Sequence, residues 1–207
     1  MYINTIHTQP TNTFQYREPN DENGHPYYHE IPLINNVLLE GYYQSFLFID
    51  WCREYILDIF GLPYKMNEGV VSVHVRRGDC IGVDAFPIAP REYYQNAIKY
   101  MQAISDYKFL IFSDDIEWCK TEFVDSNYPN AIFEFSEGNT EMEDYICMQN
   151  CEHNITARST FSLTASWLNQ NPKKIVLVPT TKHRYWNSQN KDLIPNYFTQ
   201  IDFENEQ

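Results

Sequence analysis

From residue 70 onward, short apolar runs alternate with longer segments whose apolar residues recur at helical spacing. The short runs predict strands at 70–75, 108–112, 131–135, 154–157 and 174–178. The segments between them predict helices that begin after Pro90, at Asp114, after the capping box Thr140-x-x-Glu143, and near Ser159. Strands that alternate with helices in this way are typical of βαβ units. The pattern therefore predicts an α/β fold with a parallel sheet.

The first third of the chain lacks this regular pattern. Residues 1–32 are polar and contain four prolines, which predicts a loop or an arm that packs by its aromatic side chains. Residues 46–60 carry apolar side chains at helical spacing and predict one helix. We therefore divide the chain into an amino-terminal region with a linking helix, residues 1–64, and a larger domain, residues 65–207.

Composition and charge narrow the classes of partner. The chain has 207 residues, of which 43% are hydrophobic, so it is long and apolar enough for a packed core. Its net charge of −13 argues against a nucleic-acid partner, which requires a basic face. A nucleotide needs only a local basic pocket, and residues 71–77 contain two arginines and no acidic residue. With seven glycines in the whole chain, no Gly-rich phosphate loop is present.

The cysteines and the apolar runs bear on the cellular compartment. Five scattered cysteines predict reduced thiols and a cytoplasmic protein. Cys147 and Cys151 have the spacing of half a metal site, but no second pair completes it, which favours core thiols. The sequence shows neither a signal peptide nor an apolar run long enough for a membrane anchor.

Polar side chains follow three of the predicted strands. Ligands of open parallel sheets bind at the carboxyl ends of the strands, so these side chains predict a site on one rim. They are Arg76, Arg77 and Asp79 after the first strand, Ser113, Asp114 and Asp115 after the second, and Arg158, Ser159 and Thr160 after the fourth.

The arginine pair indicates the kind of ligand. The planar guanidinium fork matches two phosphate oxygens, so Arg76 and Arg77 at a strand end suggest a diphosphate site. The alternative is a surface turn whose arginines pair with local carboxylates. Strand alternation places His74 and Arg76 on the same face.

The segment His74-Val75-Arg76-Arg77-Gly78-Asp79 resembles the His-x-Arg-Arg-x-Asp signature of α1,2- and α1,6-fucosyltransferases. Further segments resemble the α1,2 family, glycosyltransferase family 11, in the same order. They are residues 39–45, 93–98, 112–120 and 151–162, so the resemblance covers about residues 36–190.

This resemblance implies a Rossmann-like donor domain of the two-domain glycosyltransferase class called GT-B. It also implies transfer of fucose from GDP-fucose to a glycan hydroxyl, with inversion, an α1,2-linkage and no metal cofactor. The family usually opens with a Gly-Leu-Gly-Asn-Gln motif in an acceptor-binding domain, and this chain lacks it. Three interpretations remain: a minimal transferase, half of a split enzyme whose partner subunit supplies the acceptor region, or a GDP-sugar-binding module that no longer catalyses.

The resemblance also implies roles for residues near the first strand. Arg76 and Arg77 would neutralise charge on the β-phosphate, with Arg76 the first candidate because it shares a face with His74. His74 would be a structural hydrogen-bonding residue and Asp79 a strut that orients the arginines. Asp84 has the spacing of the base proposed in the α1,6 relatives, so we take it as the candidate catalytic base.

The fourth strand would lead into a second phosphate element. The amino end of the following helix, with the hydroxyls of Ser159, Thr160 and Ser162, would form an anion site, to which Arg158 adds a cation. The alternative is that Ser159 only caps the helix. In this segment the chain departs from the family's usual Asn-Ser-Thr-Phe-Ser-Trp-Trp-Gly pattern.

Three further carboxylates have two interpretations each. Asp144 matches an aspartate that contacts guanine in related enzymes, and it is alternatively a solvated carboxylate in an acidic run. Asp114 and Asp115 resemble a metal-binding Asp-x-Asp motif, but adjacent carboxylates diverge in an extended loop. Helix capping with a ribose or acceptor contact is therefore favoured for this pair, while a metal-dependent transferase stays the alternative.

Overall fold

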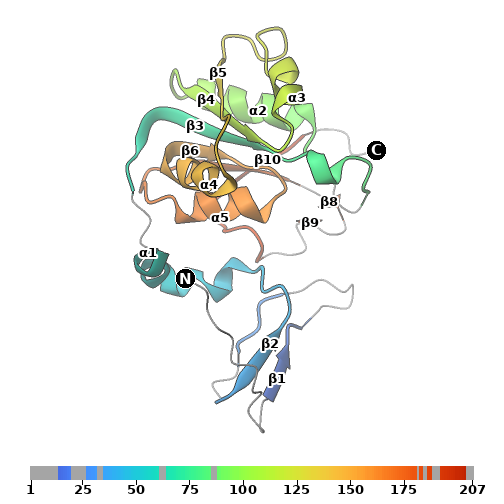
Figure 1. Ribbon diagram of the computed structural model, residues 1–207, viewed down its shortest axis with the longest axis vertical. Coiled ribbons are helices and arrows are strands. Elements are labelled where there is room, and N and C mark those ends of the chain that lie inside the picture. Colours follow the sequence, from blue (N-terminus) through green and yellow to red (C-terminus); the bar gives the residue numbers. More distant parts are fainter. Residues whose placement is uncertain are drawn as a thin grey trace.

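The computed structural model describes residues 14–19, 27–31, 35–60, 64–84, 88–180, 182–183, 186–187 and 192–203. Its main body is a six-stranded sheet with helices on both faces (Figure 1). Every neighbouring pair in this sheet is parallel. In spatial order its strands are β10 (Thr199–Ile201), β7 (Val176–Pro179), β6 (Cys151–Ile155), β3 (Asn67–Val75), β4 (Lys108–Ser113) and β5 (Ile132–Phe135).

The strand order identifies the fold. The sheet begins in the middle with β3 and extends through β4 and β5 to one edge. The chain then returns to place β6 on the other side of β3 and continues outward through β7 and β10. This is the 3-2-1-4-5-6 order of the Rossmann fold, in which ligands bind at the carboxyl ends of the strands where the order reverses. The predicted α/β fold with a Rossmann-like parallel sheet is confirmed, and the reversal lies between β3 and β6.

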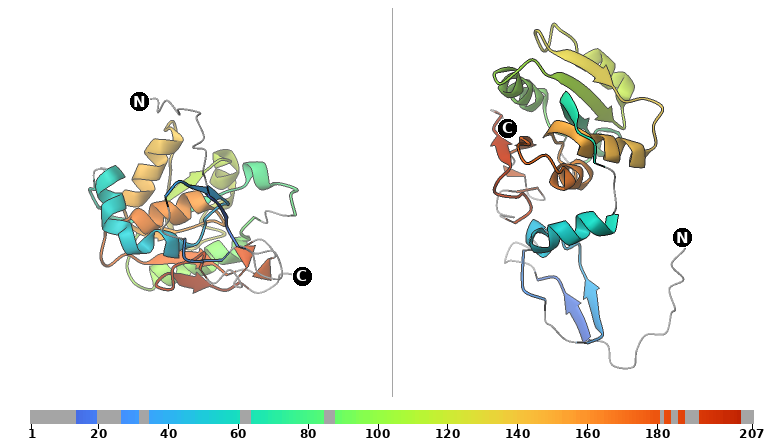
Figure 2. Two further views of the ribbon diagram at one scale, coloured as in Figure 1. Left: turned by 90° about the horizontal axis from the view of Figure 1, so that it is seen from below. Right: turned by 90° about the vertical axis from the view of Figure 1, so that its left-hand side faces the viewer.

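Helices cover both faces of the sheet, as two views of the ribbon show (Figures 1 and 2). Helices α2 (Arg91–Gln102) and α3 (Ile116–Glu122) lie on one face, and α4 (Glu141–Asn150) and α5 (Thr160–Leu168) on the other. Strand β4 shows the alternation: Ile111 joins the core cluster with α2, while Phe112 packs with Met148 and Ala165 from α4 and α5. Burial on both faces explains why the central strands read as nearly continuous apolar runs.

Helix and strand boundaries confirm most of the predicted elements. The capping box at Thr140 and Glu143 begins α4, and Ser159 occupies the cap position of α5. Helix α3 begins at Ile116, two residues after the predicted start at Asp114, and Asp115 is its cap. Strand β6 covers 151–155, whereas 154–157 was predicted. Strand β10 and the antiparallel pair β8 (Lys182–His183) and β9 (Trp186–Asn187) were not predicted.

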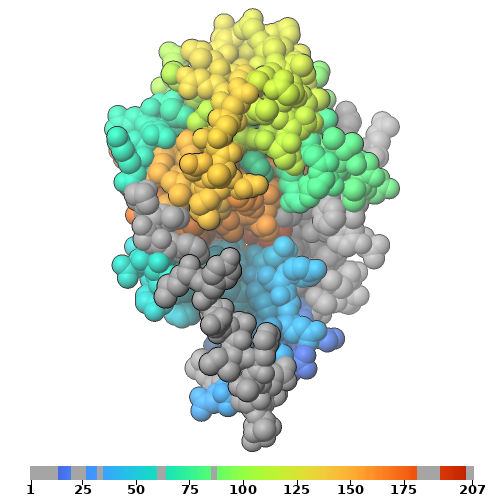
Figure 3. Space-filling model, in the orientation of Figure 1, coloured from blue at the N-terminus to red at the C-terminus, as the bar shows by residue number. Residues whose placement is uncertain are grey.

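The amino-terminal region differs more from its prediction. The single helix predicted over 46–60 is wrong in its first half. That half forms two 3-10 turns, η1 (Phe46–Phe48) and η2 (Asp50–Cys52), before α1 (Arg53–Phe60). Strands β1 (Phe14–Arg17) and β2 (Val37–Glu40) pair in parallel, so the loop prediction is wrong for residues 14–17. This pair lies apart from the main sheet, at the lower end of the molecule in Figure 1, and blue atoms of this region are visible in the lower part of Figure 3. The remainder of 1–32 lies largely outside the described residues, and the division at residue 64 stays a prediction.

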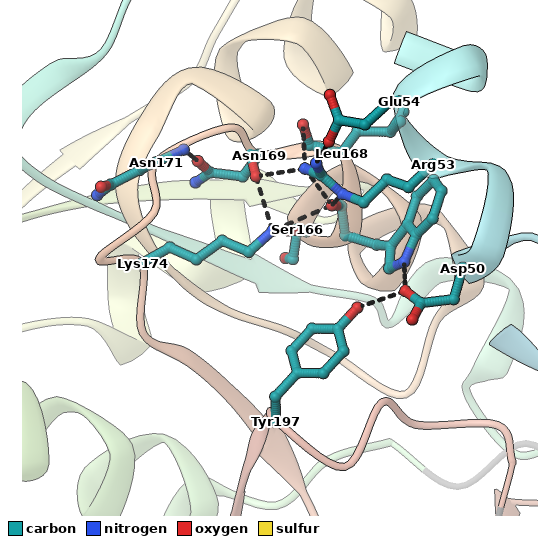
Figure 4. Close-up of polar contacts among 10 residues, drawn as sticks. Asp50, Arg53, Glu54, Ser166, Leu168, Asn169, Asn171, Lys174 and Tyr197 are labelled. Carbon is teal, nitrogen blue, oxygen red and sulfur yellow. Dashed lines mark hydrogen bonds and ion pairs between the residues drawn. The ribbon is translucent and has the colours of Figure 1, made fainter. Parts of the chain in front are cut away.

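Helix α1 is fixed to the carboxyl end of α5 (Figure 4). Arg53 donates hydrogen bonds to the carbonyl oxygens of Trp167, at 3.0 Å, and Asn169, at 2.9 Å. Lys174 donates to the carbonyls of Ser166, at 2.8 Å, and Asn169, at 2.7 Å. Two basic side chains thus donate to the last carbonyls of α5, and burial lowers the pKa of Lys174 there to about 7. The helix dipole favours positive charge at this end.

Among the helices of the described residues, none has the length and apolar character needed to cross a membrane.

Candidate functional site

The candidate site lies where β3 and β6 end. Arg76 and Arg77 directly follow β3, while residues 156–159 lead from β6 into α5. The ring centres of His74 and Phe161 are 5.7 Å apart, which links the end of β3 to the first turn of α5. The end of β4 joins them, because the Arg77 N–H donates to Asp114 Oδ1 at 2.8 Å. The three predicted strand ends therefore meet at one edge of the sheet.

Arg76 is held by Asp79 through a two-point ion pair. The distance from Nε to Oδ1 is 3.0 Å and from Nη2 to Oδ2 is 2.6 Å. Hydrogen bonding from Arg76 lowers the pKa of Asp79 to about 2, so Asp79 is ionised near neutral pH. The two side chains are 35% and 63% exposed, so a ligand from solvent can reach the guanidinium. This geometry supports the predicted role of Asp79 as a strut.

Arg77 has different surroundings. Its Nε donates to Asp115 Oδ2 at 3.2 Å, and its guanidinium carbon lies 3.7 Å from the centre of the Trp118 ring. Asp115 also accepts the Trp118 N–H at 3.4 Å and so caps α3. No role for Trp118 is predicted from the sequence. The available signal was an aromatic residue three positions after a predicted cap, which places it in the first helical turn.

His74 is a buried, neutral imidazole. It is 8% exposed, and burial lowers its pKa to about 4. Its Nδ1 and the hydroxyl oxygen of Thr156 are buried atoms that no hydrogen-bonding group in the described part of the chain satisfies. The predicted structural hydrogen bond is therefore absent at Nδ1 among these residues. Buried polar atoms without partners are rare, and two of them beside the same strand ends suggest a polar ligand or water there.

The amino end of α5 is open. Ser159 has the extended backbone of a cap residue and is 2% exposed, yet its side chain makes no capping hydrogen bond. The interpretation that its side chain only caps the helix is therefore wrong. Ser162 Oγ accepts from the Ala157 N–H at 3.3 Å, while Thr160 is exposed. The guanidinium of Arg158 lies 5.3 Å from the centre of the Phe203 ring. An uncapped helix start attracts anions, because its first N–H groups point outward.

The other predicted carboxylates, Asp144 and Asp84, take no part in the contacts that join the three strand ends. Asp144, in the first turn of α4, accepts from Ser136 Oγ at 2.6 Å and from Asn139 Nδ2 at 3.2 Å. It is thus tied to the loop after β5 and is not simply a solvated carboxylate. Asp84 is exposed in the turn that follows β3, and no hydrogen bond or ion pair joins it to another described residue. Its role as a base stays a prediction.

Asp114 and Asp115 diverge, as predicted. Asp114 accepts the backbone N–H of Arg77, whereas Asp115 contacts the Arg77 side chain and caps α3. In the described part of the chain, no cluster of three or more His, Cys, Asp or Glu side chains could hold a metal ion. Cys147 and Cys151 are free thiols.

Comparison with known proteins identifies a family whose model matches most of this chain. A family model described as glycosyl transferase family 11 matches residues 44–196. The chain is 32% identical over 167 residues to the Escherichia coli O-antigen biosynthesis glycosyltransferase WbnK, covering 70% of this chain and 55% of that protein. It is 39% identical over 121 residues to an Escherichia coli alpha-1,2-colitosyltransferase, covering 53% of this chain and 40% of that protein.

Mammalian proteins are similar as well. The identity to galactoside alpha-(1,2)-fucosyltransferase 2 of Pongo pygmaeus is 29% over 158 residues, which covers 64% of this chain and 45% of that protein. The chain thus spans about half the length of the curated relatives it matches.

Proposed function

Because the chain belongs to glycosyltransferase family 11, we propose that it transfers fucose from GDP-fucose to a hydroxyl group of a glycan acceptor. The observation that carries this proposal is the pairing of two anion-binding features at one place. A solvent-accessible arginine and an uncapped helix start lie together where the strand order of a Rossmann-like sheet reverses.

The arrangement suits a diphosphate leaving group. When the bond between the anomeric carbon and the β-phosphate oxygen breaks, negative charge grows on GDP. Arg76, oriented by Asp79, would stabilise that charge, a contribution worth roughly 2–4 kcal/mol for one well-placed donor. The first turn of α5 would hold the second phosphate with Ser159, Thr160 and Ser162, and Arg158 would add charge. The unpaired Nδ1 of His74 would accept from a donor-sugar hydroxyl or a bound water.

The remaining residues complete the proposal. Asp144 would contact the guanine, using the carboxylate oxygen that Ser136 and Asn139 leave available. Asp84 would take the proton of the acceptor hydroxyl as it attacks opposite the leaving group, which inverts the anomeric carbon. Attack by the 2-hydroxyl of the acceptor would make the linkage α1,2. Arginine side chains and the N–H groups at the start of α5 would stabilise the phosphate charge in place of a metal ion. A partner subunit that supplies acceptor contacts, and a cytoplasmic location, stay predictions.

A second donor sugar has a specific observation in its favour. Identity to the colitosyltransferase is 39%, against 29% to the fucosyltransferase from Pongo pygmaeus. Colitose is fucose without the 3-hydroxyl group. A donor pocket that hydrogen-bonds to that hydroxyl would reject GDP-colitose by several orders of magnitude, roughly 10⁴-fold, whereas a pocket that ignores it would accept both.

The test is GDP release from GDP-fucose and GDP-colitose, with and without a panel of acceptor glycans, in EDTA. We expect acceptor-dependent release in EDTA, with transfer to the 2-hydroxyl of the acceptor. Tight GDP binding without turnover on any acceptor would instead favour the binding module or the split enzyme. Loss of activity in EDTA with recovery in Mn²⁺ would favour a metal-dependent enzyme using Asp114 and Asp115.

A further inference from the structure

The two adjacent arginines are held in different ways. Arg76 pairs with Asp79, a carboxylate on its own turn that is 63% exposed. Arg77 is 19% exposed and contacts two side chains of another element, Asp115 and Trp118 of the α3 segment. Consecutive residues at a strand end leave toward opposite faces, and the contacts agree with this. Trp118 packs against the core cluster on the α2 side, whereas His74 meets Phe161 on the α5 side.

Two side chains already contact the guanidinium of Arg77. Its Nε is paired with Asp115, and the flat face of its guanidinium lies against the indole ring at 3.7 Å. A cation over an indole contributes roughly 0.5–2 kcal/mol, depending on how far water is excluded. To bind a phosphate directly, Arg77 would have to exchange these contacts or share its guanidinium with them. Arg76 is paired as well, because Asp79 accepts from its Nε and Nη2. Its side chain is more exposed than that of Arg77, 35% against 19%, so its remaining N–H groups are easier for a phosphate to reach.

The backbone around Arg77 is fixed by the same segment. Its N–H donates to Asp114 Oδ1 at 2.8 Å. At Gly78, an added Cβ would lie 3.0 Å from Asp114 Oδ2, closer than side-chain carbons normally approach. The turn 76–79 therefore rests directly on Asp114. Asp114, Asp115 and Trp118 together hold this turn from the end of β4.

We propose that Arg77 is a positioning residue, clamped by Trp118 and Asp115, that fixes the turn from which Arg76 reaches the diphosphate. The proposal rests on the proposed function, and it assigns the two arginines different tasks. Arg76 contacts the leaving group, while Arg77 acts through Arg76. Trp118 becomes a residue on which turnover depends although it touches no substrate.

The experiment compares substitutions along the clamp with Arg76→Ala. Trp118→Phe keeps an aromatic face for the guanidinium, whereas Trp118→Leu keeps only apolar volume. We expect Trp118→Phe to retain kcat within about 3-fold, and Trp118→Leu to lower kcat roughly 10- to 100-fold, because small displacements of a catalytic group are costly. The KM for the donor should change less than about 3-fold in both, since the displaced charge matters most in the transition state.

GDP and guanosine affinities give a readout that does not depend on turnover. Arg76→Ala should reduce the preference for GDP over guanosine by roughly 10-fold or more, because it removes a phosphate contact. Arg77→Ala should leave that preference within about 3-fold of wild type while lowering kcat. Arg77→Lys keeps the cation over the ring and should recover part of the lost kcat. If Trp118→Leu does not fold, the comparison of Arg77→Ala with Arg77→Lys still decides the question.

Arg53→Ala is the matched control, since Arg53 lies over Trp167 at 5.5 Å on the far end of α5. It should lower the melting temperature and leave the GDP preference unchanged. The positioning role is overturned if Arg77→Ala removes the GDP preference as fully as Arg76→Ala does, or if Trp118→Leu leaves kcat unchanged. Wild-type protein that neither binds GDP nor turns over a donor overturns the proposed function, and this proposal with it.

Discussion

The two ends of helix α5 differ in the side-chain hydrogen bonds that their terminal backbone groups make. At its carboxyl end, Arg53 and Lys174 pair with the carbonyls of the last turn, and Asn169 bonds to the carbonyl of Cys151 at 2.7 Å. At its amino end, Ser159 leaves its cap bond unmade although it is a residue type well suited to capping. The positive end of the dipole therefore has no side-chain cap from Ser159, while the carbonyls of the negative end accept from two basic side chains.

We assign the two ends of α5 to different tasks, the carboxyl end to stability and the amino end to ligand binding. The closed end ties α1 to the sheet domain and has contacts that a ligand would only disturb. The open end lies at the edge of the sheet where β3 ends, and Phe161 of its first turn meets the His74 ring. A bound anion there would accept from the first N–H groups of the helix, which the Ser159 side chain leaves uncapped. We therefore expect substitutions at the open end to change ligand binding and turnover, and those at the closed end to change stability.

The largest expected effect is at Arg76. Arg76→Ala and Arg76→Lys should each lower kcat/KM by roughly 30- to 1000-fold, because lysine keeps the charge but loses the two-point fork. The melting temperature without ligand should fall little, since the ion pair with Asp79 is largely exposed. Steady-state kinetics beside a thermal melt checks both. A large loss of stability with kinetics near wild type would make Arg76 a structural residue.

At the closed end, Arg53→Ala should destabilise the protein by about 2–4 kcal/mol. It leaves carbonyls of α5 without a charged donor and removes the link to α1. Urea denaturation measures this loss, and Arg53→Lys should recover part of it. Stability near that of wild type would show that the linkage between α1 and α5 is weak.

The buried imidazole at the open end predicts a dependence on pH. Burial lowers the pKa of His74 to about 4 in the folded protein, while the unfolded chain has an ordinary histidine. As the pH falls, the unfolded state therefore binds the proton before the folded state does. The contribution of His74 to the free energy of unfolding is present above about pH 6.5 and is lost as the pH falls toward 4. Between pH 6.5 and 5 the loss is about 1.5 kcal/mol. The difference in unfolding free energy between wild type and His74→Asn should follow this curve, and a difference independent of pH would contradict it.

The smallest expected effect concerns Ser159. Ser159→Ala removes a side chain that forms no cap bond, so the free energy of unfolding should change by less than about 0.5 kcal/mol. GDP affinity should nevertheless fall several-fold if its hydroxyl contacts phosphate. Thr140→Ala is the comparison, because Thr140 does cap α4 and should cost about 1 kcal/mol. Equal losses of stability in the two variants would mean that Ser159 acts as an ordinary cap.

The parts of the site that depend on local sequence pattern could be predicted. The strand ends, the capping box at Thr140 and the cap position of Ser159 follow from short-range periodicity and residue type. Asp79 is three residues from Arg76, so their ion pair lies within one turn. The burial of His74 follows from its place in a central strand covered on both faces.

Contacts between distant segments could not be read in the same way. The stacking of Arg77 on Trp118 depends on how α3 leaves β4, and the bonds from Arg53 to α5 join residues more than 110 positions apart. Strand β10 is three residues long and pairs only because β7 presents an open edge. The strand pairing of 14–17 with 37–40 likewise depends on a partner 23 residues away, in a segment without a strong alternating pattern.

The most direct test of the open end is an amide NMR titration of the isotopically labelled protein with GDP in EDTA, beside a titration with guanosine. Binding of the diphosphate at α5 predicts that GDP, and not guanosine, shifts the amides of Ser159, Thr160 and Phe161 together with the side-chain Nε–H of Arg76. The amides of residues 165–169, at the closed end of the same helix, should stay unchanged. GDP binding that leaves the first turn of α5 and Arg76 unshifted would contradict the account.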